Sequence, residues 1–148
     1  MPHFGLMDEY ALGPVEGPLM RAKLHIRGGR RRLRQGKTSL GIITLYDAII
    51  SAMQWYISNP SHKNKFTIKD NENTNDDSTV YKVLTRSGVL DGSFDYDAFS
   101  ELAEKALHQD LSDYDYQDML RGVESVMTQL GVMPFDESAL PPEDPKTV

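Results

Sequence analysis

Basic side chains that could bind phosphate are concentrated near the start of the chain. Eight of the sixteen Lys and Arg residues fall between Gly17 and Lys37, with no acidic residue among them. Such groups bind phosphate through charge-assisted hydrogen bonds, so the segment is a candidate anion-binding or nucleic-acid-binding site. It has no aromatic residue on which a base could stack. The candidate residues are Arg27, Arg30, Arg31, Arg34 and Lys37.

Acidic residues are concentrated at the other end of the sequence. Residues 91–148 contain fourteen Asp or Glu and three Lys or Arg, a net charge of −11. A basic helix can therefore pair with acidic elements of its own fold or of a second copy, or it can bind an anionic ligand. We favour pairing within a bundle or dimer, and the sequence leaves the alternative open.

A nucleotide-binding loop is suggested by Gly36-Lys37-Thr38-Ser39, which stands where a helix is expected to begin. A phosphate-binding loop requires a further glycine five positions before Gly36, so that successive backbone N–H groups surround the phosphates. That position is Arg31. We interpret the tetrapeptide as an ordinary helix start.

A metal site has four weak candidate ligands. Glu101, Glu104 and His108 share one face of an expected helix, a spacing that can ligate a metal inside a bundle. That face is polar, however, so a solvated stripe explains it better. Asp47 lies in the middle of the most apolar expected helix, and an ion pair with an arginine of the preceding helix explains it better than catalysis. The sequence predicts no cofactor.

The composition is that of a single globular domain. The chain has 148 residues, 39% hydrophobic and 26% charged, and no cysteine, which excludes disulfides, thiolate metal sites and cysteine nucleophiles. No run of 18 apolar residues is present, and residues 1–10 lack the pattern of a signal peptide. We expect a cytoplasmic protein that does not interact with membranes.

The periodicity of apolar residues predicts an all-α, up-and-down bundle of four or five helices. An extended N-terminal arm covers residues 1–16, one helical domain covers 17–132, and a Pro-rich extended tail covers 133–148. The first helix begins at Gly17-Pro18 and ends at Gly36, although residues 20–27 also alternate as a strand would. The second helix, capped by Thr38 or Ser39, is the central one because most of its circumference is apolar.

Shorter elements follow the central helix. Residues 59–77 are polar and predict a long mobile loop. Three short helices come next, the first ending at Gly88 and the last at Gly131. Their expected caps are Ser78 for the first, Ser93 or Asp95 for the second, and Ser112 or Asp113 for the third.

Residues 21–57 resemble the opening helix pair of HEPN-like bundles. The resemblance is carried by Ala22, Ile26, Leu33 and Gly36, and then by Ser39, Ile42, Leu45-Tyr46, Ala48 and Ser51-Ala52. It implies an up-and-down helical bundle, often dimeric, in a family whose members include ribonucleases and inactive partners. The ribonuclease members carry an arginine and a histidine on a late helix, with four to six residues between the two. Here Arg21 and His25 have only three residues between them and lie on an early helix, so the resemblance implies a catalytically inactive member.

Three functions are compatible with these patterns. The one we favour is a non-enzymatic helical interaction or regulatory module that self-associates or binds a protein partner. An RNA-binding or nucleotide-binding protein, possibly related to nucleases, would use residues 27–37. The third is a metal-dependent bundle enzyme using Asp47, Glu101, Glu104 and His108.

Overall fold

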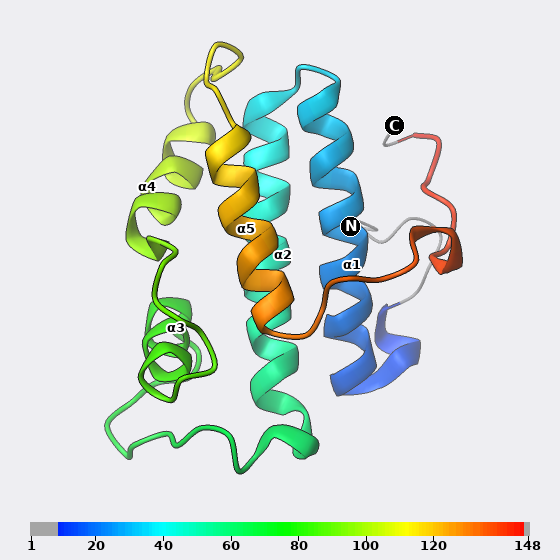
Figure 1. Cartoon of the computed structure of the whole chain (residues 1–148). Helices are drawn as coiled ribbons and strands as arrows, with labels where there is room; N and C mark the ends of the chain where they lie inside the picture. Colours follow the sequence, from blue (N-terminus) through cyan, green and yellow to red (C-terminus); the bar gives the residue numbers. More distant parts are fainter. Residues whose placement is uncertain (1–8, 147–148) are drawn as a thin grey trace.

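The computed structural model describes residues 9–146, which contain five α-helices and no strand. This confirms the predicted all-α class. In Figure 1, α1 and α4 run upward and α2 and α5 run downward. Helix α3 lies near the lower end of the bundle. The helices are α1 (Gly13–Arg34), α2 (Thr38–Ser58), α3 (Asp77–Arg86), α4 (Tyr96–Ala106) and α5 (Gln117–Gln129). Short 3-10 turns occupy Glu9–Leu12, Pro60–His62 and Glu137–Ala139.

Helix α1 is continuous through residues 20–27, which confirms the helical interpretation of that segment over the strand alternative. The helix begins at Gly13, four residues before the predicted start. Pro14 rather than Pro18 takes the first turn, where a missing N–H is harmless. The predicted extended arm is therefore wrong for residues 9–16, which are helical, and residues 1–8 of that arm lie outside the described residues. Gly36, with φ of +79°, ends the helix as expected.

Two glycines let α1 and α2 approach each other closely. A Cβ on Gly29 would lie 2.6 Å from Leu45 Cδ2, and a Cβ on Gly41 would lie 2.7 Å from Leu33 Cδ2. Neither position has room for a methyl group unless its neighbour moves. The close pairing of the two helices depends on these glycines, and it sets the position of every side chain that crosses between them.

Helix α2 is the central helix, as predicted, and packs against α1, α3, α4 and α5. By length and apolar composition alone it could cross a membrane, but 61% of its apolar stretch is buried inside the bundle, as in a core helix. The predicted cap is wrong, because Lys37 occupies the N-cap position and makes no side-chain cap. Thr38 is buried, and the Ser39 hydroxyl donates to the Gln109 carbonyl (2.7 Å). Ser39 also accepts from the Leu111 N–H (3.0 Å), so it fastens the loop after α4 to α2.

The loop over residues 59–77 is held against the bundle at several points. The His62 ring stacks on Tyr56 with centroids 3.9 Å apart, and Phe66 packs against the core. Glu72 pairs with Arg86 of α3 at 2.6 Å. The sequence predicted the loop but not these attachments, because they join residues of the loop to residues of other elements.

The caps of the short helices follow local sequence only in part. Asp95 accepts from the Ala98 N–H and caps α4, one of the two predicted alternatives. Helix α3 is capped by Asp76 rather than by Ser78. Helix α5 begins at Gln117, later than the predicted Ser112 or Asp113, after a turn.

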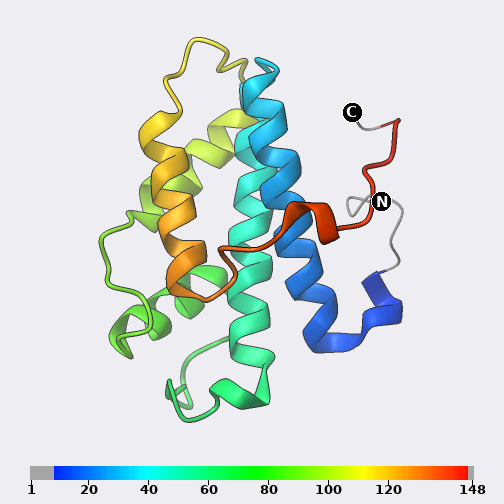
Figure 2. The same ribbon diagram turned by 45° about the vertical axis from the view of Figure 1, so that its right-hand side comes forward.

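The C-terminal tail lies across α1, as Figure 2 shows. Met133 and Phe135 pack against the core, and the Lys23 ammonium lies 5.9 Å from the centre of the Phe135 ring. The tail is largely extended, as predicted, apart from the short turn at Glu137–Ala139. It is nevertheless part of the fold, because it covers one face of α1.

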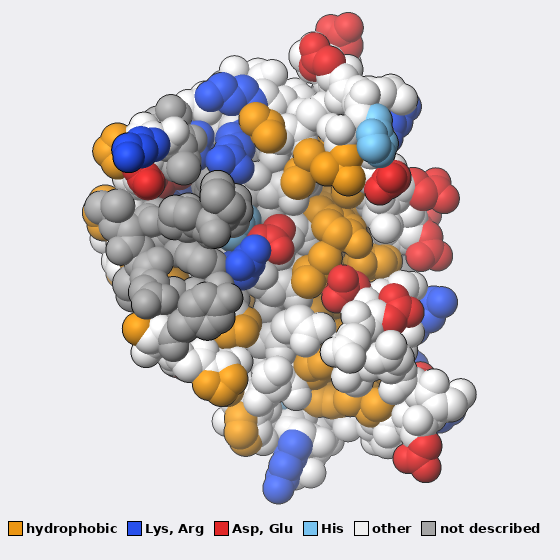
Figure 3. Space-filling view, turned by 180° about the vertical axis from the view of Figure 1, so that it is seen from behind, with side chains coloured by type: hydrophobic (Ala, Val, Ile, Leu, Met, Phe, Trp, Pro, Cys, Tyr) orange, Lys and Arg blue, Asp and Glu red, His pale blue; other side chains and the backbone are white. Residues whose placement is uncertain are grey.

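The opposite side of the molecule has an uncovered apolar face. Figure 3 shows an apolar band along the side of α2 and α4, with acidic side chains on its α4 side and basic side chains toward α1 at its upper end. Leu40 of α2 is 52% exposed, and Leu107, directly after α4, is 60% exposed. By helical spacing Leu107 falls on the same apolar face as Phe99, Ala103 and Ala106, which predicts that it is buried, but the structure places it outside.

Candidate functional site

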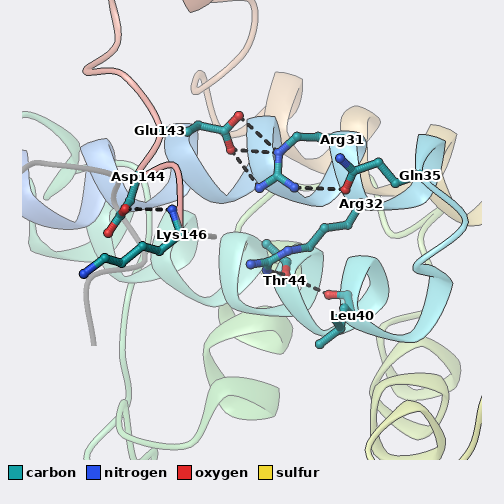
Figure 4. A network of polar contacts seen from close by, with 8 residues as sticks. All are labelled: Arg31, Arg32, Gln35, Leu40, Thr44, Glu143, Asp144 and Lys146. Carbon is teal, nitrogen blue, oxygen red and sulfur yellow. Dashed lines mark hydrogen bonds and ion pairs between the residues drawn. The ribbon is translucent and has the colours of Figure 1, made fainter. Parts of the chain in front are cut away.

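The predicted basic set is divided between paired and exposed residues. Arg30 donates to Glu124 of α5 (3.0 Å) and to Glu137 of the tail (2.7 Å). Arg31 pairs with Glu143 of the tail at 2.9 Å and also donates to Gln35, as Figure 4 shows. The acidic end of the chain thus supplies the partners of these two arginines, as the favoured interpretation expects.

The remaining members of the set do not form one cluster. The Arg27 Nε atom is buried and has no hydrogen-bond partner among the described residues. Arg34 and Lys37 are exposed at the end of α1 and in the following turn. Arg32, which was not a candidate, reaches across to the Thr44 hydroxyl of α2 (2.5 Å). Burial, and then the charge of Arg31, lower the pKa of Arg32, while Glu143 opposes this shift.

Asp47 joins two residues of α1 in one polar cluster. Its Oδ2 lies 2.8 Å from Arg21 Nη2 and 2.9 Å from His25 Nε2. The ion pair between Asp47 and an arginine of the first helix agrees with the preferred interpretation of this residue. His25 is only 4% exposed, and its Nδ1 lies 2.9 Å from the Arg21 carbonyl oxygen. Both ring nitrogens of His25 therefore lie within hydrogen-bonding distance of an oxygen atom.

The same cluster sets the ionisation of Asp47. Burial by itself would raise the pKa of this carboxyl group, but the hydrogen bond and charge of His25, together with Arg21, outweigh burial and lower the pKa. The sequence analysis missed His25. The sequence feature that could have pointed to His25 is its position four residues after Arg21, which puts both side chains on one face of α1. That face lies opposite Asp47, the single acid of the central helix.

The metal candidates are not brought together. Asp47 faces α1, whereas Glu101, Glu104 and His108 lie on the exposed face of α4. Glu104 and His108 form an exposed pair with 3.3 Å between Oε1 and Nε2. Among residues 9–146, no group of three His, Asp or Glu side chains is placed to hold a metal ion.

A hollow lies between α2 and α4, on the apolar band of Figure 3. This α2–α4 groove has a volume of about 460 Å³, with Ile43, Tyr46, Ala103 and Leu107 among its apolar lining and two acids at its edge. A second hollow of about 430 Å³ lies beside it and shares Leu107. The second hollow is lined by Leu40 and Leu107, with Lys37 and His108 nearby.

Aromatic packing makes the wall of the α2–α4 groove rigid. The Tyr46 hydroxyl lies 3.1 Å from that of Tyr96, and its ring lies 5.7 Å from the Phe99 ring. Burial, and then the hydrogen bond with Tyr46, raise the pKa of the Tyr96 hydroxyl, so this hydroxyl stays neutral near pH 7. The groove is a preformed apolar surface without a charged group at its centre.

The groove could have been inferred from one feature of the sequence. Helix α2 is apolar around most of its circumference, and a helix of this kind needs neighbours on every side. In the structure, neighbouring helices cover the strip of α2 that contains Ile43 and Tyr46 only in part.

The fold defines this chain as an all-α helical bundle. No family model, curated protein or solved structure matches the chain. The resemblance of residues 21–57 to HEPN-like bundles stays a prediction.

Proposed function

We propose that this protein is a non-enzymatic helical interaction module that self-associates through its α2–α4 face. The observation that carries the proposal is the exposure of Leu40 and Leu107 beside a preformed apolar groove. Burying a leucine side chain contributes about 2 kcal/mol. Contiguous exposed apolar surface with a polar rim is typical of protein–protein interaction sites.

Binding of RNA or nucleotides by residues 27–37 is the weaker alternative. Arg30 and Arg31 already bond Glu124, Glu137 and Glu143. A phosphate group would have to displace these carboxylates, which are held nearby by the covalent chain. Arg34 and Lys37 remain exposed, but two cations supply few of the contacts on which phosphate affinity depends.

A metal-dependent reaction has less support still. Its four candidate ligands lie on two different faces of the molecule, because Asp47 faces α1 whereas Glu101, Glu104 and His108 are exposed to solvent. Asp47 is occupied by Arg21 and His25. This polar cluster is best explained as a structural link between α1 and α2.

The proposal is tested by size-exclusion chromatography with light scattering, across a concentration series. The measurement is made at low salt and at about 0.5 M salt, where charges are screened beyond roughly 4 Å. We expect a dimer that persists at high salt, because its core is apolar. A monomer at both salt concentrations and at every protein concentration contradicts self-association.

A further inference from the structure

Acidic side chains line one long edge of the α2–α4 groove, and basic side chains lie at the upper end of the opposite edge. Glu101 and Glu104 of α4 line one edge. At the other edge Arg32 reaches α2 from α1, and Lys37 lines the adjoining hollow beside Leu107. Figure 3 shows this arrangement, with acidic side chains on the α4 side of the apolar band and basic side chains toward α1. An apolar strip between edges of opposite sign is complementary to itself.

The charges distinguish between the two ways in which a twofold axis can lie in this face. If the axis runs parallel to α2, the left edge of one copy meets the right edge of the other, so basic residues face acidic ones. If the axis runs across α2, each edge meets the same edge of the other copy, so the acidic edge formed by Glu101 and Glu104 faces its own equivalent. Like charges in contact across an interface are strongly unfavourable, so the parallel axis is selected.

We propose that a second copy of this chain covers the groove in a twofold dimer whose axis runs parallel to α2. Leu40 and Leu107 of both copies form the apolar centre. The corner formed by Arg32 and Lys37 faces Glu101 and Glu104 of the partner subunit. This inference rests on the proposed self-association and names its surface and its orientation. Such an interface is isologous, since the same patch is used by both copies.

The apolar centre is tested with Leu107→Glu. Each dimer would then hold two carboxylates where two leucines were buried, so we expect the dimer dissociation constant to rise at least about tenfold. Leu40→Glu is the second variant, and circular dichroism checks that each variant is folded. Ile68→Glu is the matched control, because Ile68 is also an exposed aliphatic residue (38%) but lies in the loop before α3. We expect Ile68→Glu to dimerise like the wild type.

The orientation is tested by a charge exchange between copies. Lys37→Glu and Glu104→Lys should each weaken the dimer at low salt, because like charges then face each other twice. Mixing the two variants should restore association, since the mixed dimer regains both opposite-charge pairs. Neither change should destabilise the monomer, because a glutamate at the start of α2 and a lysine near the end of α4 interact favourably with the helix dipoles.

The outcomes separate this inference from the proposed function. A dimer that survives both Leu107→Glu and Leu40→Glu overturns the groove interface, while self-association itself stands. Loss of the dimer in these variants without rescue in the mixed charge variants overturns the parallel orientation. A wild-type monomer under all conditions overturns both the interface and the proposed function.

Discussion

Two faces of the molecule differ in whether their side chains have partners within the same chain. One is the face of α1 that contacts the tail, and the other is the face between α2 and α4. On the α1 face, Arg30 and Arg31 bond carboxylates that lie 94 and 112 residues further along the chain. On the α2–α4 face, Leu40 and Leu107 remain exposed beside a hollow. The α1 face forms its ion pairs within one molecule, whereas the α2–α4 face leaves apolar side chains exposed. The difference teaches that a run of basic residues can find its partners inside its own fold, while a central apolar helix can remain partly uncovered.

Removing the carboxylate of Asp47 should have the largest effect on the stability of one copy. Asp47→Ala leaves the nearly buried His25 and the half-buried Arg21 without their shared acceptor. We expect a loss of about 2 kcal/mol in the free energy of unfolding, less than for a fully buried pair because both Asp47 and Arg21 are partly exposed. Urea denaturation measures the loss. Asp113→Ala, at an exposed turn position, is the control, and an equal effect there contradicts the structural role of the cluster.

Acid should weaken the same cluster. The pKa of Asp47 in the folded protein lies below its ordinary value of 3.8. The carboxylate therefore stabilises the fold at higher pH, and this contribution is lost as the pH falls through the folded-state pKa. We expect the stability difference between the wild type and Asp47→Asn to shrink below about pH 4. A difference that stays constant down to about pH 2 contradicts the assignment.

Neutralising two carboxylates of the tail should leave Arg30 and Arg31 with fewer acidic partners. Glu137→Gln with Glu143→Gln removes the tail carboxylates from Arg30 and Arg31. The loss of stability should be about 1 kcal/mol, because these pairs are partly exposed. Binding of a mixed oligonucleotide at low salt should strengthen, because two negative charges are removed from beside Arg30 and Arg31. The matched control is Asp70→Asn with Asp113→Asn, two exposed acids in the loops before α3 and α5, which should change neither property, and equal oligonucleotide binding by both pairs of variants contradicts the prediction.

Changing the uncovered face should have the smallest effect on the stability of one copy. Leu107 is mostly exposed, so Leu107→Glu should alter the free energy of unfolding of the monomer by less than about 0.5 kcal/mol. Urea denaturation at a protein concentration where the chain is monomeric measures this. A large loss of monomer stability would mean that Leu107 belongs to the core, and it would remove the contrast between the two faces.

Several properties of this protein follow from local sequence alone. The helix pattern was predictable because apolar spacing, proline positions and terminal glycines act within a few residues, as Gly36 at the end of α1 and Asp95 at the start of α4 illustrate. The central place of α2 was predictable because an apolar helix must be buried. The start of α1 was predicted wrongly because Pro14 and Pro18 satisfy the same local rule.

The candidate site was only partly accessible from sequence. The opposite charge blocks predicted pairing within a bundle or a dimer, and the structure shows pairing within one chain for Arg30 and Arg31. Which acid each arginine bonds depends on how the tail crosses α1, and no local pattern specifies this. His25 was missed for the same reason, since its role requires Asp47 of the facing helix at 2.9 Å.

The sequence by itself determined the all-α class, the order of the helices and the segregation of charge along the chain, because these depend on residue types and on short spacings. Only the tertiary structure decided which charges pair and which apolar side chains stay uncovered. The close contact at Gly29 and Gly41 sets how α1 lies on α2, and the attachment of Ser39 to the loop after α4 sets where Leu107 emerges. Both are contacts between distant parts of the chain, which exist only once the bundle has formed.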